Sequence, residues 1–119
     1  NYAYEYDREL RFRKRHVLQS GYTFMGIQTV EFADGRWWFG CYGNPQSLLV
    51  ADEELRTVKR YEFDCSLGII GGANGKFLVA RGRCSKDTGC RGELRPAKPS
   101  PERGLVLEET GAGQNCGGC

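Results

Sequence analysis

The sequence has few of the features that usually reveal a catalytic, metal-binding or membrane protein. Its 119 residues include one methionine and one histidine, His16, and a lone histidine makes no zinc site without cysteine or carboxylate partners. No apolar run approaches the roughly 18 residues that a membrane-spanning helix requires. Lysine and arginine number 17 against 15 aspartate and glutamate, a balance that does not indicate nucleic-acid binding. No catalytic combination stands out, and we expect neither a metal nor a cofactor.

The composition is that of a turn-rich globular β protein. Hydrophobic residues make up 39% of the chain and charged residues 27%, which is too apolar for a disordered protein. The 17 glycines indicate many turns. A length of 119 residues suits a single domain or part of one.

A repeat runs through the chain. The segment DRELRFRKR at 7–15 returns as DEELRTVKR at 52–60, and ADGRWWF at 33–39 returns as ANGKFLV at 73–79. A Gly-Ile dipeptide precedes the second segment in both copies. Three blocks recur in the same order at a nearly constant spacing of about 40 to 45 residues, which is typical of a β-propeller blade.

Turn signals within the repeat predict β-hairpins. Asp34-Gly35 and Asn74-Gly75 each stand between apolar runs and predict two-residue turns, because a type I′ turn needs positive φ at both central residues. Pro96 falls within an expected strand and indicates an edge or irregular position. The expected strands include 2–7, 27–32, 36–42, 47–51, 55–63, 76–81, 92–98 and 104–109.

We therefore predict an all-β fold of antiparallel, four-stranded, blade-like repeats, a partial β-propeller of about two and a half blades. Residues 1–26 would form the strand pair of an incomplete first repeat, 27–68 the second repeat and 69–110 the third. Residues 111–119 would be a flexible tail rich in glycine and cysteine. Because propellers usually have four to eight blades, this chain alone cannot close one. We expect another chain, or further blades of the same protein, to cover the terminal repeats.

The repeated pattern resembles the blades of secreted bacterial β-propellers, broadly of the sialidase-like group. The run Ser85-Lys86-Asp87-Thr88-Gly89 resembles the start of the Asp-box turn of such blades, although glycine stands at the expected aromatic position. The resemblance implies a secreted or extracytoplasmic module that binds a glycan or another protein. The alternative that it implies is a fragment of a glycoside-hydrolase-like propeller enzyme.

The resemblance also implies that the loops 19–26, 43–47, 64–68 and 82–91 share one binding face. Polar residues of these loops are candidates for ligand contact, and the innermost strand adds a residue that could line a central channel. The candidate ligand-binding residues are Tyr22, Gln28, Asn44, Asp64, Arg81 and Asp87. The alternative is that they are solvated turn residues. If the chain belongs to an enzyme, Asp64 and Asp87 are the candidates for the catalytic acid and base, but nothing in the sequence indicates that they lie close together.

The six cysteines, an even number, indicate a disulfide framework and an oxidising compartment, although they allow 15 pairings. Cys84 and Cys90 bracket one loop, so a bridge that closes it is geometrically easy. Cys41 and Cys65 form a second candidate pair within one repeat. The last two lie in NCGGC, at 115–119. The alternative is a metal site formed by Cys84, Cys90, Cys116 and Cys119. The spacing between Cys84 and Cys90 is longer than that between the first two cysteines of common zinc sites.

Overall fold

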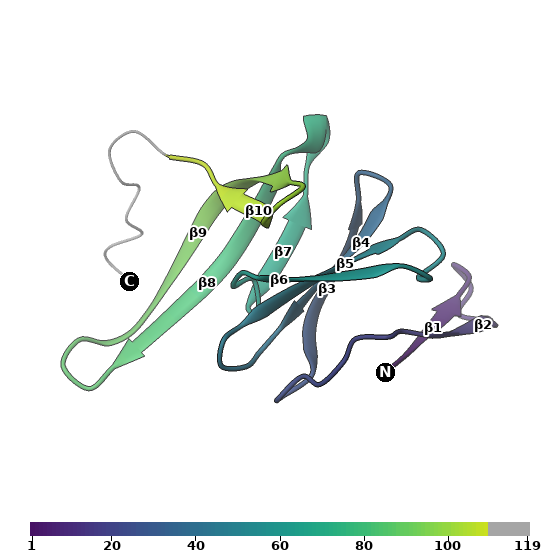
Figure 1. Ribbon diagram of the computed structural model, residues 1–119, viewed down its shortest axis with the longest axis horizontal. Coiled ribbons are helices and arrows are strands. Elements are labelled where there is room, and N and C mark those ends of the chain that lie inside the picture. The colour runs from purple at the N-terminus through teal and green to yellow at the C-terminus, as the bar shows by residue number, and fades with distance from the viewer. Residues whose placement is uncertain (110–119) are drawn as a thin grey trace.

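The computed structural model describes residues 1–109, which form antiparallel β-structure without an α-helix (Figure 1). The all-β antiparallel prediction is thereby confirmed. Among these residues there is no helix long and apolar enough to cross a membrane. The expected tail at 111–119 lies outside the described residues. The elements are β1 (Tyr2–Tyr6), β2 (Phe12–Val17), β3 (Ile27–Ala33), β4 (Arg36–Cys41), β5 (Ser47–Asp52), β6 (Val58–Glu62), β7 (Gly68–Gly71), η1 (Ala73–Gly75), β8 (Phe77–Ser85), β9 (Gly89–Ser100) and β10 (Gly104–Leu107).

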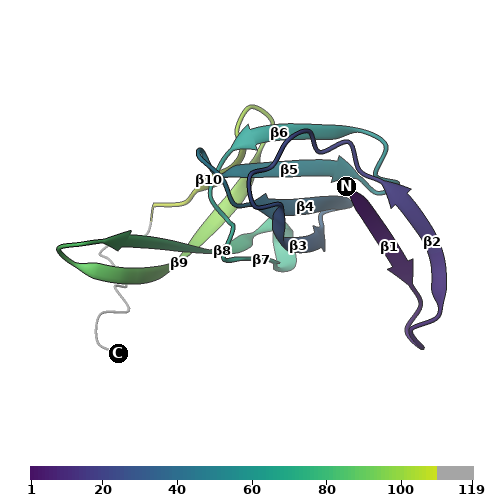
Figure 2. The ribbon, with the colours of Figure 1, turned by 90° about the horizontal axis from the view of Figure 1, so that it is seen from below.

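The strands form two four-stranded sheets and one separate hairpin. In each larger sheet the spatial order follows the chain, β3-β4-β5-β6 and β7-β8-β9-β10, and neighbouring strands are antiparallel. The hairpin β1-β2 stands apart, and no sheet within residues 1–109 closes on itself. The three units lie in series along the longest axis of the molecule, which measures 45 Å (Figure 1). The ribbon of β8 and β9 projects away from the remaining strands (Figure 2).

One of the two predicted hairpin turns has the expected length. Asp34 and Gly35 have φ values of 55° and 68° and connect the paired ends of β3 and β4. Asn74 and Gly75 also have positive φ, but they lie in a longer connection, 72–76, that contains the 3-10 turn η1. The two-residue prediction is wrong there because the backbone N–H of Gly72 donates to the carbonyl of Lys76 at 2.7 Å, which leaves the three residues of η1 to make the turn.

The repeated acidic segment adopts the same turn in both copies. The carboxylates of Asp7 and Asp52 each accept a hydrogen bond from the backbone N–H four residues later, Arg11 at 2.9 Å and Arg56 at 2.8 Å. The leucine three residues after each aspartate has a φ of 62° in both copies. The repeat in sequence is therefore a repeat in structure, and the hairpin β1-β2 is equivalent to β5-β6.

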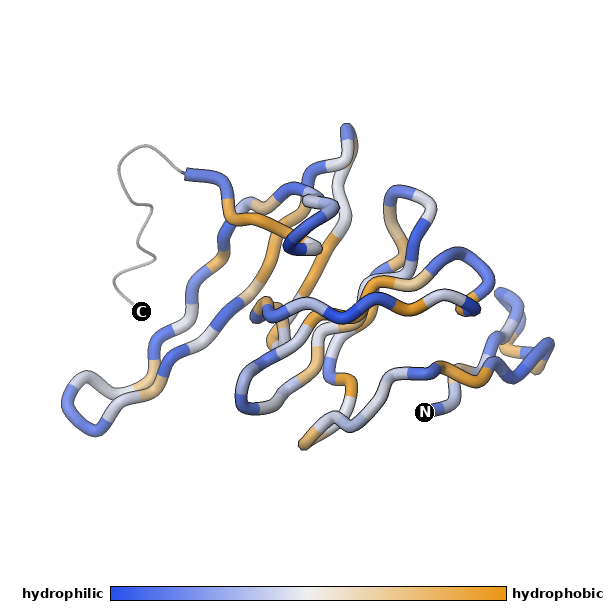
Figure 3. The backbone as a smooth tube through the Cα atoms, viewed as in Figure 1, coloured by the Kyte–Doolittle hydropathy of each residue, from blue (hydrophilic) through white to orange (hydrophobic). Residues whose placement is uncertain are grey.

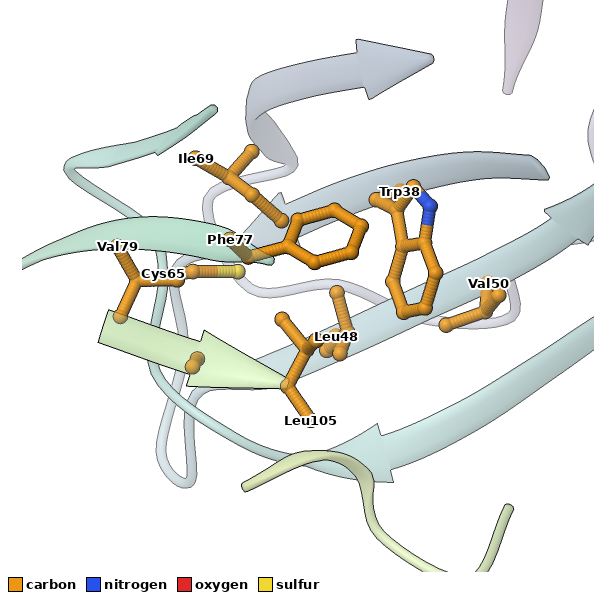
Figure 4. Close-up of a cluster of buried hydrophobic side chains, with 9 residues drawn as sticks. Trp38, Leu48, Val50, Cys65, Ile69, Phe77, Val79 and Leu105 are labelled. Atoms are coloured by element: carbon orange, nitrogen blue, oxygen red, sulfur yellow. The ribbon is translucent and has the colours of Figure 1, made fainter. Parts of the chain in front are cut away.

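The core consists of two clusters on opposite faces of the sheet β3–β6. The larger cluster lies between the two four-stranded sheets, where the ring centroids of Trp38 and Phe77 are 4.7 Å apart (Figure 4). In the smaller cluster, Leu18 from the segment after β2 joins Leu49 of β5. Alternate residues of β5 enter the two clusters, so this strand is covered on both faces. Figure 3 shows apolar stretches along the strands where the sheets meet, while the turns are mostly hydrophilic.

Pro96 lies in the interior strand β9, not at an edge as its sequence context suggested. The backbone N–H of Glu108 donates to the Pro96 carbonyl at 2.9 Å, on the side of β10. In an antiparallel strand the nitrogen and carbonyl of one residue point to the same side. The missing N–H of proline therefore faces Glu108, just beyond the end of β10, and the Glu108 carbonyl accepts a hydrogen bond from the Arg95 guanidinium at 3.4 Å instead.

Candidate functional site

A groove is lined by residues of β6 and β10, the last strands of the two larger sheets. Its main cavity has a volume of about 940 Å³. A second cavity of about 320 Å³ continues it toward the loops before β3 and after β4. We call the two together the β6–β10 groove. Both cavities contact Pro45, Gln46, Arg60, Tyr61 and Glu62, so they adjoin each other along β6.

Tyr61 of β6 connects the two sides of the groove. Its hydroxyl donates a hydrogen bond to the carbonyl of Pro101, 3.3 Å away. Its ring lies so close to Gly104 that a Cβ atom there would be 2.7 Å from the ring, and Gly104 has a φ of 78°. Only glycine satisfies both the close approach and the positive φ. This contact sets the distance between β6 and β10.

Arg60 lines the second cavity and makes three hydrogen bonds there. Its guanidinium donates hydrogen bonds to the carbonyls of Ser20 at 3.2 Å and Tyr22 at 2.8 Å, and to the hydroxyl of Ser47 at 3.1 Å. The segment before β3 is thereby attached to the sheet. The side chain of Tyr22 is 79% exposed.

The charges that line the main cavity are balanced. Arg81 has its nearest carboxylate at Glu93, 3.7 Å away, and its buried Nε has no hydrogen-bond partner among the described residues. Three arginines face three carboxylates around the cavity: Arg60, Arg81, Arg103, Glu62, Asp64 and Glu102. Such a surface provides many hydrogen-bonding groups without the excess of one sign that a polyanion would require.

Asp64 has a structural task besides lining the main cavity. Its Oδ1 accepts hydrogen bonds from the backbone N–H of Ser66 at 3.1 Å and from its hydroxyl at 2.9 Å, which fixes the turn before β7. Asp87 lies between β8 and β9, at the tip of the ribbon, and lines neither cavity. The two carboxylates considered as an acid and base therefore do not meet in one site of the described chain.

The groove brings together most of the residues that the sequence nominated. Tyr22 and Asn44 line the second cavity, and Asp64 and Arg81 line the main one. Gln28 lies outside both, where its side-chain amide donates to the carbonyl of Met25 at 2.7 Å.

Sequence reasoning missed Arg60, Tyr61 and Arg103 as lining residues. The first two belong to β6, for which the sequence predicted a strand at 55–63 but no role in binding. The third lies in the turn before β10. The sequence signal that could have indicated them is Tyr61, an aromatic residue directly after the basic pair Lys59-Arg60.

The cysteines divide into one bridge and two thiols. Cys84 and Cys90 form a disulfide across the ribbon, with Cα atoms 4.0 Å apart. Cys41 and Cys65 are free, contrary to the second bridge considered, because they belong to core clusters on opposite faces of the sheet β3–β6. Burial, aided by the Asp64 carboxylate, raises the pKa of Cys65 to about 12, and burial also raises the pKa of Cys41. Both are poor nucleophiles at neutral pH.

Within residues 1–109, no three His, Cys, Asp or Glu side chains gather in a way that suits a metal ion. The alternative metal site that includes Cys116 and Cys119 lies outside the described residues. Comparison of the chain with protein-family models, curated proteins and solved structures finds no match.

Proposed function

We propose that the chain is part of an extracytoplasmic binding module of the β-propeller type, and that its ligand is a neutral oligosaccharide bound in the β6–β10 groove. The observation that carries this proposal is a set of three exposed aromatic residues that line the second cavity, next to the polar main cavity. Tyr22, Phe24 and Tyr42 are 79%, 66% and 44% exposed along the second cavity. Exposed apolar groups gathered at a groove mark binding sites. A tyrosine offers both a flat apolar face for a sugar ring and a hydroxyl.

The architecture supports the propeller part of the proposal. Both larger sheets follow the chain in strand order, and their first strands, β3 and β7, lie side by side. The acidic turn returns in the same geometry, which is expected of consecutive blades built from one repeat. The Cys84–Cys90 disulfide favours an oxidising compartment.

Calorimetric titration of the whole chain with a panel of neutral and acidic oligosaccharides tests the ligand class. We expect a neutral oligosaccharide to bind, and Tyr22→Ala or Phe24→Ala to weaken it about tenfold or more, equal to about 1.4 kcal/mol. Tyr4→Ala is the matched control, because Tyr4 is 55% exposed on β1 and lines neither cavity. Absence of binding across the panel, or an equal loss in the Tyr4 and Tyr22 variants, would contradict the proposal.

A second matched pair separates the polar contribution of the main cavity from general charge effects. Arg81 lines this cavity, whereas Arg83 lies two residues further along β8 and lines neither. We expect Arg81→Ala to weaken oligosaccharide binding and Arg83→Ala to leave it unchanged. Chromatography of the same oligosaccharides after incubation should recover them intact, and their cleavage would favour the hydrolase alternative instead.

A further inference from the structure

The outer part of the ribbon formed by β8 and β9 projects from the remaining strands (Figure 2). Residues 82–94 are all exposed, so this part adds nothing to the core of the described chain. A two-stranded ribbon by itself is at best marginally stable in water. The Cys84–Cys90 disulfide joins the two strands of the ribbon near its turn and keeps them paired.

Arg83 and Arg91 lie directly opposite each other in this ribbon. The strand register pairs them, next to the pair Cys84 and Cys90. Side chains of directly paired residues lie on the same face of a sheet, with Cβ atoms about 5 Å apart. Two like charges in this position repel each other and destabilise the pairing of the strands. The neighbouring disulfide holds the two arginines together against this repulsion.

No carboxylate of the described chain neutralises this arginine pair. Neither Arg83 nor Arg91 forms an ion pair within residues 1–109. The next residue along β9 on the same face is Glu93, because side chains alternate between the two faces of a strand. Its carboxylate already lies 3.7 Å from Arg81 and 3.9 Å from Arg95. Four arginines therefore share one glutamate on this face, and the outer two are left without a counter-charge.

The chemistry of the pair favours a doubly charged oxyanion as its ligand. Guanidinium groups donate charge-assisted hydrogen bonds to phosphate, and these are stronger than bonds between neutral groups. A phosphate monoester carries between about −1.5 and −2 charges at neutral pH, enough to balance both arginines, whereas a carboxylate brings one. The turn beyond the pair carries Lys86 and Asp87, whose opposite charges leave the excess on the arginines.

We propose that the Arg83–Arg91 pair binds a phosphate group, at a site separate from the β6–β10 groove. Neither residue lines a cavity of that groove. Both are exposed, so a phosphate group reaches them from solvent without a rearrangement of the chain. The bound group replaces the repulsion between the two guanidinium groups by two attractive contacts, and it thereby stabilises the ribbon.

Titration of the whole chain with inorganic phosphate, at an ionic strength held constant with sodium chloride, tests the site. NMR signals of the arginine Nε–H groups report binding directly. We expect those of Arg83 and Arg91 to shift and to saturate with a Kd on the order of 1 mM, as two charge-assisted hydrogen bonds imply. The signal of Arg13, which is 64% exposed on β2 but ion-paired with Glu5, is the control and should not shift.

A second probe, glucose 6-phosphate, distinguishes the source of the phosphate group. Tighter binding than that of inorganic phosphate assigns the site to an esterified phosphate on a larger ligand. Equal or weaker binding assigns it to the free ion. Signals that respond to phosphate no more than to chloride at the same ionic strength would overturn the proposal.

Two variants separate the site from a general effect of phosphate. Arg91→Glu places a carboxylate opposite Arg83, so it should keep the ribbon paired and weaken phosphate binding at least tenfold. Without phosphate, this variant should melt at a temperature no lower than the unmodified chain. Arg83→Gln removes the repulsion without adding a charge and should also weaken binding, whereas Arg13→Gln should bind as the unmodified chain does.

The same variants supply the decisive comparison by thermal melting. Phosphate also stabilises folded proteins by exclusion from their surface, but that effect is equal in all four chains. We expect phosphate to raise the melting temperature of the unmodified chain and of Arg13→Gln more than that of the other two variants. An equal rise in all four chains, or phosphate binding that Arg91→Glu leaves intact, would refute a site at the arginine pair.

Discussion

Replacement of Phe77 by alanine tests whether the two larger sheets fold as one unit. Phe77 is 3% exposed, and its ring packs against Trp38, which is 1% exposed, in the cluster between the sheets. Truncation of a buried phenylalanine to alanine costs about 3–5 kcal/mol, from lost transfer free energy and the cavity left behind. An aromatic pair contributes about 0.5–1.5 kcal/mol beyond buried area. Because whole domains are stable by only about 5–15 kcal/mol, the loss should be a large part of the total.

Urea unfolding followed by tryptophan fluorescence and far-UV circular dichroism measures this loss. Trp38 contributes to the fluorescence together with Trp37, so this signal reports the packing on both faces of the sheet β3–β6, and the circular dichroism reports the strands. We expect both signals to change in one transition, displaced to lower urea in Phe77→Ala with little change in the m-value. Phe12→Ala is the control, because Phe12 is 58% exposed on β2, and it should change the free energy of unfolding by less than about 1 kcal/mol.

Two results would refute this reasoning. One is a loss below about 1 kcal/mol in Phe77→Ala, since a contact worth so little does not hold two sheets together. The other is a separation of the two signals into different transitions, which would mean that the sheets unfold independently.

Three further predictions concern the turn at Asp52, the Cys84–Cys90 disulfide and the buried thiol of Cys65. The backbone N–H of Arg56 lowers the pKa of Asp52, so its stabilisation is complete above about pH 4 and is lost as the pH falls below that. Thermal melts should therefore show Asp52→Asn less stable at pH 7, with the difference shrinking below pH ~4. Reduction of Cys84–Cys90 should lower the free energy of unfolding by at most about 2 kcal/mol in urea titrations, because the closed loop is short. Iodoacetamide at pH 8 should modify Cys65 only in unfolded protein, as peptide mapping would show, since burial and a pKa of about 12 keep the thiol protonated.

Strands and their order could be predicted because their signals are local. Alternating apolar residues around Asp34-Gly35 specify two strands and the turn between them without reference to the rest of the chain. The repeated Asp-x-Glu-Leu-Arg segment was equally informative, because the aspartate satisfies backbone N–H groups of its own turn. Asn74-Gly75 shows the limit of such signals. Both residues have the positive φ that the dipeptide favours, but they lie in a longer turn that a backbone hydrogen bond from Gly72 to Lys76 closes.

The state of the cysteines, the position of Pro96 and the lining of the groove could not be predicted from the sequence. Each depends on which face of a sheet a residue lies on and on which strand packs against that face. Cys41 and Cys65 belong to the same repeat, but they lie in core clusters on opposite faces of the sheet β3–β6. Which cluster each thiol joins depends on how the sheets stack. Pro96 is compatible with an interior strand because the carbonyl opposite its missing N–H, that of Glu108, accepts a hydrogen bond from Arg95 instead. The charged lining of the main cavity comes from two repeats, with Arg60, Glu62 and Asp64 from the second and Arg81, Glu102 and Arg103 from the third.

The stacking that builds the core also produces the groove. At the inner side, β3 and β7 approach closely, and a Cβ atom on Gly71 would collide with Ala33. At the outer side, β6 and β10 are spaced by the Tyr61 ring against Gly104. Two twisted sheets that touch through a glycine at one edge and through a tyrosine at the other must diverge outward, as a wedge. The open end of this wedge is the β6–β10 groove, so the site that we propose for ligand binding is set by side-chain size at the two edges of one contact.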